Sequence, residues 1–336
     1  MRETVGVAFI GAGRMGLSHA RTLGGIPAAR VVVVADPDLE AARRGQALCG
    51  AETATSDIDA AIGAPGVEAV MIVTPTNTHA ALIQKAARAG KAVWCEKPIA
   101  LTLAETQQTL EVVEAAGVPC QIGFQRRYDP GYAQARRLIE EGKLGKLEAF
   151  RALSRDTYLP SPQSLPPSGG TFLDMSVHDF DLARFLVGEV EEVSAWGAVL
   201  AHPMFADADD CDTAVCMLRF ESGVLGVVEA ARHSNWGYDI RTEVAGSEGK
   251  VVIEAPPKTP LQHFTGFQNH TDVYLNFPDR FEQAYRSQME AFFDALLQGK
   301  TPTPGPRDAL ETLRICLAAK QSWKQGRPVK VREVRD

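Results

Sequence analysis

The stretch that decides the fold runs from Val5 to Gly16 and reads Val-Gly-Val-Ala-Phe-Ile-Gly-Ala-Gly-Arg-Met-Gly. Its first six residues have the continuous apolar character of a buried strand, and a helical pattern follows from Leu17 to Leu23. Gly11, Gly13 and Gly16 have the G-x-G-x-x-G spacing, which allows a tight turn, close approach of a pyrophosphate, and close packing of helix on strand. The phosphates would bind the exposed amides at the helix N-terminus. This stretch therefore predicts a dinucleotide-binding fold.

A carboxylate after the next strand strengthens this prediction against the alternative of a purely structural glycine turn. The strand Val31–Ala35 ends in Asp36, about 20 residues after the last glycine, where an acidic residue binds the ribose hydroxyls of NAD. The same charge would repel the 2′-phosphate of NADP. Pro37 follows with no adjacent arginine, and we interpret Arg43 and Arg44 as part of a solvated face. The sequence therefore favours NAD.

Strands and helices continue to alternate to residue 123. The expected strands are 69–73, 91–95 and 118–122, and the expected helices are 78–89 and 103–116. Such alternation predicts a doubly wound parallel sheet, in which ligands bind beyond the carboxyl ends of the strands. We therefore expect a Rossmann domain over residues 1–123.

Two of these strand ends carry polar residues that are candidates for the cofactor site. One is Thr74 to His79, whose structural interpretation is a helix start capped by Asn77 or Thr78. The other is Glu96-Lys97-Pro98, with Lys97 where a nicotinamide is expected; its alternative is an ordinary surface charge.

Residues 124–336 predict a second, α+β domain. A helix is expected over 130–141, and two more over 281–297 and 307–323. The expected strands are 147–153, 190–197, 213–220, 224–231, 240–244 and 251–253. Hairpin signals at 221–223 and 246–249 favour a large, mostly antiparallel open sheet. Residues 155–168, rich in proline, read as a loop.

One face of that sheet would carry Val215, Met217 and Val227. Another part of the chain could cover these residues. We favour the alternative, an interface between copies of the chain, which makes a homo-oligomer the expected state.

A stripe of ionisable residues follows Gly169 and Gly170. Asp174, His178 and Asp181 lie at i, i+4 and i+7, which predicts that they share one face of a single helix. Burying such a stripe would be costly, so it faces either water or a functional site.

Composition excludes several classes of function. The formal net charge is −7, which favours neither nucleic acid nor an anionic membrane as a partner. Six cysteines occur without CxxC or zinc-ligand spacing, and no signal peptide or membrane-spanning stretch is evident, so we expect a cytoplasmic protein.

With these features in order, the chain resembles the glucose–fructose oxidoreductase and inositol dehydrogenase (Gfo/Idh/MocA) family over essentially its whole length. The resemblance rests on the glycine motif with Asp36, on Glu96-Lys97-Pro98, and on Asp174-x-x-x-His178 after two glycines. Within the family the chain is most similar to inositol 2-dehydrogenases, through residues 124–130, 173–181 and 237–247. The stretches 160–167 and 256–278 match no family pattern, and Arg126 stands where a less charged residue is typical.

The resemblance implies a catalytic triad of Lys97, Asp174 and His178, a cis peptide before Pro98, and dimers or tetramers formed through the C-terminal sheet. It implies hydride transfer from a cyclic polyol to NAD, with myo-inositol as the first candidate and another sugar or polyol as the second. An NAD-sensing regulator without activity is a third. Either His178 or Lys97 could accept the hydroxyl proton.

The expected site residues form two further groups. The cofactor group comprises Gly11, Gly13, Arg14, Met15, Gly16, Asp36, Thr74, Asn77, His79, Glu96 and Lys97. The substrate group comprises Arg127, Asp156 and Tyr238, whose structural alternatives are a surface salt bridge, a loop cap and sheet packing, respectively. No metal is expected, because Asp179 and Asp181 beside His178 on one helix make poor ligand geometry.

Overall fold

The computed structural model describes residues 3–335, which form two compact units. The first comprises residues up to 128 together with 283–311, and the second comprises 129–282 together with 312–335. This division differs from a single boundary after residue 123, because helix α12 (Glu282–Leu297) returns to the first unit. Its residues Met289, Phe292 and Phe293 are completely buried in the first unit's core.

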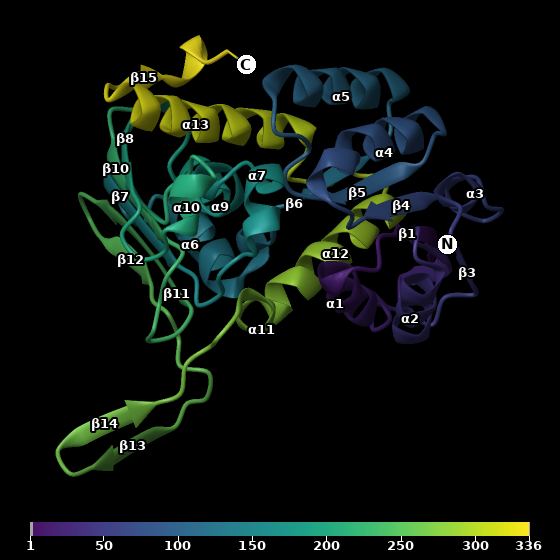
Figure 1. Cartoon of the computed structure of the whole chain (residues 1–336), viewed down its shortest axis with the longest axis horizontal. Helices are drawn as coiled ribbons and strands as arrows, with labels where there is room; N and C mark the ends of the chain where they lie inside the picture. The colour runs from purple at the N-terminus through teal and green to yellow at the C-terminus, as the bar shows by residue number, and fades with distance from the viewer. Residues whose placement is uncertain (1–2, 336) are drawn as a thin grey trace. The chain divides into compact units, whose positions relative to one another are not determined.

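The first unit is the predicted Rossmann fold. Its six strands are all parallel in the order β3-β2-β1-β4-β5-β6, with α4 and α5 on one side of the sheet and α1 and α2 on the other (Figure 1). The strands are β1 (Val5–Ile10), β2 (Ala29–Ala35), β3 (Thr53–Thr55), β4 (Ala69–Ile72), β5 (Ala92–Glu96) and β6 (Cys120–Gly123). The helices are α1 (Arg14–Leu23), α2 (Leu39–Cys49), α3 (Ile58–Ile62), α4 (Thr76–Arg88) and α5 (Leu103–Ala116), and the 3-10 helix η1 (Gln125–Tyr128) follows β6.

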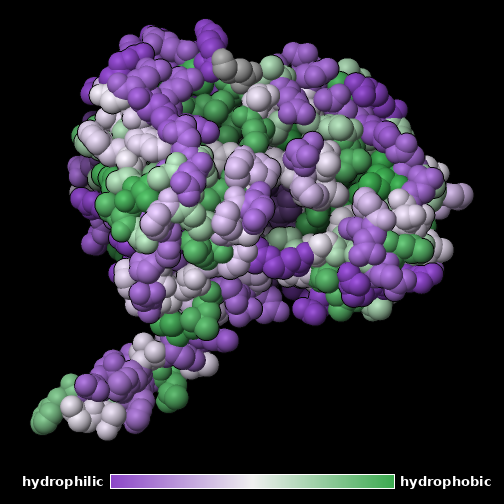
Figure 2. Space-filling model, viewed as in Figure 1, coloured by the Kyte–Doolittle hydropathy of each residue, from purple (hydrophilic) through white to green (hydrophobic). Residues whose placement is uncertain are grey.

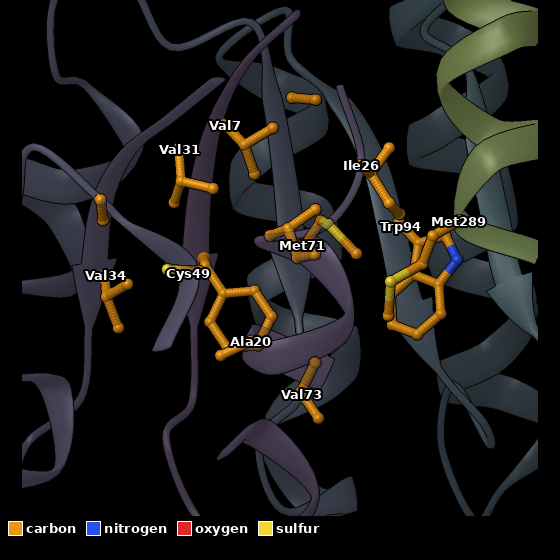
Figure 3. Packing of buried hydrophobic residues seen from close by; sticks show 14 of the residues in the cluster. Val7, Ala20, Ile26, Val31, Val34, Cys49, Met71, Val73, Trp94 and Met289 are labelled. Carbon is orange, nitrogen blue, oxygen red and sulfur yellow. The ribbon is translucent and has the colours of Figure 1, made fainter. Parts of the chain in front are cut away.

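The strand order reverses between β1 and β4. Ligands of doubly wound sheets bind at such a reversal, beyond the carboxyl ends of the strands. The central strands are buried on both faces, which explains their continuous apolar sequences. Val7, Met71 and Trp94 from three strands pack with Met289 of α12 in this core (Figure 3).

The second unit is built on a seven-stranded sheet in the order β12-β11-β7-β10-β9-β8-β15. Only β7 and β10 pair in parallel, so the prediction of a mostly antiparallel sheet is confirmed. The strands are β7 (Leu147–Arg155), β8 (Val190–Ala198), β9 (Thr213–Phe220), β10 (Leu225–Ala231), β11 (Asp239–Gly246), β12 (Lys250–Ile253) and β15 (Val329–Lys330).

Helices cover one face of this sheet. Among them are α6 (Pro130–Glu140) and α9 (Val177–Leu186), which lie on the same side in Figure 1. The unit's other helices are η2 (Pro162–Ser164), α7 (Leu165–Ser168), α8 (Thr171–Asp174), α10 (Met204–Asp207), α11 (Phe277–Arg280) and η3 (Val331–Glu333). Helix α13 (Pro306–Gln325) begins in the first unit and continues in the second from residue 312. The proline-rich stretch 155–168, expected to be a loop, therefore contains two short helices.

A separate hairpin accounts for part of the stretch 256–278. Strands β13 (Gln262–Thr265) and β14 (Gln268–Thr271) pair only with each other and project away from the seven-stranded sheet (Figure 1). Hydrophobic residues colour the hairpin tip green in Figure 2, and Phe264 and Phe267 are both exposed. Every helix among residues 3–335 is too short or too polar to be a candidate membrane span.

Candidate active site

The glycine loop between β1 and α1 has the geometry of a phosphate-binding turn. Gly11 has a φ of +99°, and a Cβ there would lie 2.4 Å from the carbonyl oxygen of Val73. A Cβ on Gly16 would lie 2.0 Å from the carbonyl oxygen of Gly11, so this position requires glycine for close packing. Around Gly13, by contrast, there is open space within 4 Å. Of the three motif glycines, Gly13 is thus the one that the surrounding protein atoms do not require, as expected where a ligand approaches.

The first turn of α1 is prepared for an anion. Helix α1 begins at Arg14, and no side chain caps its N-terminus at Gly13. Gly13 and Arg14 are exposed, Met15 is half-buried, and no acidic residue lies in the first turn. The positive end of the helix dipole is thus available to a phosphate group.

Asp36 lies beside this loop. Its Oδ2 accepts a hydrogen bond of 2.7 Å from the amide of Ala12, and its Oδ1 accepts one of 2.9 Å from the amide of Asp38. The carboxylate is half-buried, and two carboxylate oxygens can accept more than two hydrogen bonds. Asp36 is therefore fixed next to the glycine loop with capacity for the hydroxyls of a ribose.

The helix that follows β4 is not capped by the residues that the sequence suggested. Helix α4 begins at Thr76 with Pro75 as its N-cap, so neither Asn77 nor Thr78 is the cap residue. Thr78 lies inside the first turn, where its hydroxyl donates to the carbonyl of Pro75 at 2.8 Å and lies 2.6 Å from the hydroxyl of Thr74. Asn77 is exposed at this helix start. Proline can occupy the N-cap position because no amide hydrogen is needed there for the helical hydrogen bonds.

His79 lies beneath the site rather than on its surface. The ring is 1% exposed, with Nδ1 2.7 Å from the carbonyl oxygen of Pro98 and Nε2 2.8 Å from that of Thr74. Burial lowers the pKa of His79, and the two carbonyls oppose this effect. His79 thus connects the residues that follow β4 and β5 from a buried position.

Glu96 and Lys97 follow β5, and Glu96 is held from both sides. Nε2 of His19 in α1 lies 2.7 Å from its Oε1, and its Oε2 accepts a bond of 3.1 Å from the amide of Lys97. The Lys97–Pro98 peptide bond is cis, as the resemblance implied. His19 was not among the sequence candidates. Its position one turn after the glycine motif, facing the sheet, is the signal that identifies it.

The second unit corrects the prediction of one helix carrying Asp174, His178 and Asp181. Helix α8 ends at Asp174, and a new helix, α9, begins at Val177. The amides of Met175 and Ser176 both donate to the carbonyl of Thr171, at 3.1 and 3.0 Å, which interrupts the regular helical hydrogen-bond pattern. Asp174 thus closes one helix, and His178 lies in the first turn of the next; both side chains are partly exposed.

The two aspartates after His178 face the protein interior. Asp179 is completely buried and accepts a bond of 2.6 Å from Ser154, and Asp181 is 1% exposed with Thr312 Oγ1 at 3.5 Å. The stripe therefore does not continue along one exposed face. Among residues 3–335, no group of three or more potential ligand side chains could hold a metal ion.

The three expected substrate residues have different surroundings. Arg127, in the first unit, makes an ion pair of 3.1 Å with Asp308, which is the structural alternative considered for it. The ring of Tyr238 is 8% exposed and meets Phe281 edge-on at 6.3 Å. Asp156 lies just beyond the end of β7 and pairs with Arg232 at 3.2 Å.

Arg232 is a residue that the sequence did not single out. It follows the last residue of β10, is 5% exposed, and donates to Asp174 Oδ2 at 2.7 Å as well as to Asp156. A charged residue directly after an apolar strand is the signal that marks it. The second unit therefore brings Asp156 and Asp174 together around one buried cation, whereas Lys97 belongs to the first unit.

Comparison with protein families gives two matches along the chain. Residues 5–124 match the GFO_IDH_MocA family, described as an oxidoreductase family with an NAD-binding Rossmann fold. Residues 132–252 match the C-terminal domain of the same family.

Comparison with individual proteins gives full-length similarity. The chain is 38% identical over 333 residues to the scyllo-inositol 2-dehydrogenase (NAD(+)) of Bacillus subtilis, covering 98% of this chain and 97% of that protein. It is 37% identical over 331 residues to the myo-inositol 2-dehydrogenase of Thermotoga maritima, covering 98% and 99%. The crystal structure of scyllo-inositol dehydrogenase from Lactobacillus casei with NAD(H) and scyllo-inositol has a TM-score of 0.90 at 28% identity, covering 98% and 100%.

Proposed function

Because this chain belongs to the GFO/IDH/MocA family of NAD-binding oxidoreductases, we propose that it oxidises a ring hydroxyl of a cyclic polyol with NAD⁺. The first candidate reaction converts myo-inositol to 2-keto-myo-inositol. The full-length similarity to both scyllo- and myo-inositol dehydrogenases is the observation that supports this substrate class. It favours neither inositol over the other, so scyllo-inositol is the second candidate.

The reaction transfers two electrons and separates a proton from the substrate. The C–H bond of the carbinol breaks, and its hydride moves to C4 of the nicotinamide when NAD⁺ is bound. The O–H bond breaks as well, its electron pair forms the second bond of the ketone, and the proton passes to a base on the protein. The protein must therefore bind the cofactor, accept one proton and stabilise negative charge at the reacting oxygen.

Three residues divide these tasks in our proposal. His178 accepts the hydroxyl proton, since an imidazole is suited to proton exchange near neutral pH. Asp174 orients the imidazole or a substrate hydroxyl, and its negative charge favours the protonated ring. Lys97 donates a hydrogen bond to the reacting oxygen. The alternative is that Lys97 is itself the base, with His178 as the donor.

For substrate recognition we retain Asp156 and Tyr238. Both belong to the same unit as Asp174, and Asp156 shares Arg232 with it. A polyol offers several hydroxyl groups, so carboxylate and phenol groups are suitable partners. Arg127 is the third candidate, and its ion pair with Asp308 gives it a structural partner, as Arg232 does for Asp156.

The experiment that tests this function is a substrate panel. The purified protein is mixed with NAD⁺ and, separately, with myo-inositol, scyllo-inositol, glucose or another aldose, while NADH absorbance is recorded. We expect turnover with an inositol. Turnover with glucose alone would replace inositol by a sugar, and absence of turnover with every polyol would favour the NAD-sensing regulator.

We also propose that copies of the chain associate through the uncovered face of the seven-stranded sheet. Met217 is 51% exposed and lies opposite the exposed Val227 of the neighbouring strand, and Val215 lies opposite Trp196, which is 59% exposed. Exposed apolar side chains that adjoin one another can mark an interface. The projecting β13–β14 hairpin adds exposed apolar side chains to the same unit and supports association, because an isolated two-stranded hairpin has little stability in water.

A further inference from the structure

Two charged residues of the second unit, Asp156 and Arg232, lie at the carboxyl ends of neighbouring central strands of the seven-stranded sheet. Strands β7 and β10 run in parallel, and their last residues, Arg155 and Ala231, are paired. Asp156 and Arg232 are the next residues of each strand and therefore leave the sheet side by side. The amide of Asp156 donates to the carbonyl of Ala231 at 3.0 Å, and the amide of Arg232 donates to that of Asp212 at 2.8 Å. These hydrogen bonds fix the backbone at Asp156 and Arg232, from which the two side chains extend.

The guanidinium of Arg232 lies between two carboxylates. Nη1 donates to Asp156 Oδ2 at 3.2 Å and Nη2 donates to Asp174 Oδ2 at 2.7 Å. Burial disfavours the charge on Arg232, but Asp174 and Asp156 outweigh this and raise its pKa. The guanidinium thus joins the residue after β7 to the last residue of α8.

Helix α8 needs such contacts, because it has only four residues. A single helical turn has almost no stability of its own. At its start, the amide of Thr171 donates to the carboxylate of Asp210 at 3.0 Å, and the hydroxyl of Thr171 donates to the carbonyl of Cys211 at 2.6 Å. Gly170 fits here because a Cβ would lie 2.8 Å from Asp210.

The end of α8 is fixed by Arg232 through Asp174. The helix is therefore held at both ends by residues that lie next to strand ends: Asp210 and Cys211 before β9, and Arg232 after β10. Helix α9, with His178 in its first turn, follows two residues later. Displacement of Asp174 would be expected to alter the start of α9 as well.

We infer that Arg232 is a positioning residue for the reaction: it fixes the orientation of Asp174 and the start of the helix that carries His178. This inference rests on the proposed function. It assigns Arg232 no contact with the substrate; its effect passes through Asp174. A lysine would retain the positive charge but lose the planar, two-pronged geometry that reaches both carboxylates.

A double-mutant cycle tests this inference. Arg232→Lys is made in the native protein and in an Asp174→Asn background, and kcat, KM for the inositol and Kd for NAD⁺ are measured. We expect kcat to fall by about 100-fold in the native background, the scale of a misplaced catalytic group, while Kd for NAD⁺ stays within about twofold because Arg232 is outside the Rossmann unit. In the Asp174→Asn background, the further loss should be less than about threefold, since residues that act together are not additive. Equal losses in both backgrounds would overturn the inference.

Two further measurements separate positioning from folding and from the proposed function. Arg184→Lys is the matched control, because Arg184 lies on α9 and makes a two-pronged ion pair with Glu189 at 2.8 and 2.7 Å; its kcat should stay within about twofold of native. Amide hydrogen exchange over residues 171–178 needs no substrate. It should quicken in Arg232→Lys and not in Arg184→Lys, and unchanged exchange in Arg232→Lys would contradict the inference. If the native protein oxidises no polyol, the proposed function fails, and hydrogen exchange still decides whether Arg232 fixes α8.

Discussion

The carboxylate of Asp36 accepts a hydrogen bond of 2.7 Å from the amide of Ala12, so the acidic residue after β2 is attached directly to the glycine loop. The glycine motif and the acidic residue, which together favour NAD in the sequence, are thus joined by a hydrogen bond in the structure. A 2′-phosphate at this place would meet a carboxylate whose position the loop itself fixes, and like charges in contact are unfavourable.

Asp36→Ser should therefore relax the preference for NAD over NADP. We expect the ratio of kcat/KM for NADP⁺ to that for NAD⁺ to rise by about 100-fold, which corresponds to about 2.7 kcal/mol of lost discrimination. Asp38→Ser is the matched control, because Asp38 caps α2 and serine is also a good cap residue. An unchanged ratio in Asp36→Ser would mean that the ribose binds elsewhere.

The three motif glycines should respond differently to alanine. Gly13→Ala adds a methyl group to open space, so the melting temperature should stay within about 2 °C while Kd for NAD⁺ rises about tenfold or more. Gly16→Ala places a Cβ 2.0 Å from a backbone oxygen and should destabilise the fold by about 1–3 kcal/mol. Calorimetry and NAD⁺ titration measure both effects. Equal loss of stability in the two variants would contradict this distinction.

Replacement of the proposed base decides between His178 and Lys97. His178→Gln should lower kcat by about 10²- to 10⁴-fold, the usual contribution of a general base, with little change in Kd for NAD⁺. The rising limb of kcat/KM against pH belongs to the group that accepts the proton, so it should disappear in His178→Gln and persist in Lys97→Met. The reverse pattern would make Lys97 the base.

The Rossmann fold could be predicted because its strands are buried on both faces and carry an unmistakable apolar pattern. The run Val5–Ile10 is completely buried, and its glycine loop occurs where the motif places it. The cis bond before Pro98 followed from the resemblance alone. These features depend on short stretches of sequence, so local reasoning was sufficient.

Features that do not alter the pattern of apolar residues could not be predicted. At the break after Asp174, the amides of Met175 and Ser176 both donate to the carbonyl of Thr171. The helical spacing of the apolar residues is the same with or without this break, so it could not indicate it. The return of Met289 and Phe292 to the core of the first unit depends on contacts more than 150 residues away along the chain, as does the hydrogen bond of Gln288 to Ile122. Arg232 acquires its place only when β7 and β10 align.

Asp212 gives a prediction for the dependence of stability on pH. This completely buried carboxylate accepts bonds of 2.7 Å from the amides of Ala201 and His202 and of 3.0 Å from that of Leu200. Burial disfavours its charge, but the amides outweigh this and lower the pKa of Asp212. A lowered folded-state pKa stabilises the protein above the unfolded value and loses this effect as pH falls through the folded value.

Asp212→Asn should therefore cost about 2 kcal/mol at pH 7, because an amide cannot accept all of these bonds. The difference from the native protein should shrink below about pH 4, which urea unfolding at several pH values would measure. Asp209→Asn is the control, since Asp209 is an exposed partner of Lys324 and should have little effect. A difference that stays constant down to pH 3 would show that ionisation of Asp212 does not contribute.

The uncovered sheet face gives the final prediction. Met217 lies at the centre of a row formed with Ser194 on β8 and Val227 on β10, and half of its surface is exposed. If a second copy covers this row, Met217→Lys places a charge in an apolar contact, where it has no partner, and should shift the protein to monomers. Sedimentation velocity would record the change in mass.

Leu39→Lys is the matched control for this variant, because Leu39 is also an exposed apolar residue but begins α2 in the first unit. It should leave the assembly intact. Neither side chain is buried within the single chain, so neither substitution should unfold the protomer itself. A native protein that sediments as a monomer, or a Met217→Lys variant that keeps its multimeric mass, would exclude this face as the interface. Association would then have to involve a different surface, and the exposed Phe264 and Phe267 of the β13–β14 hairpin would be the next side chains to replace.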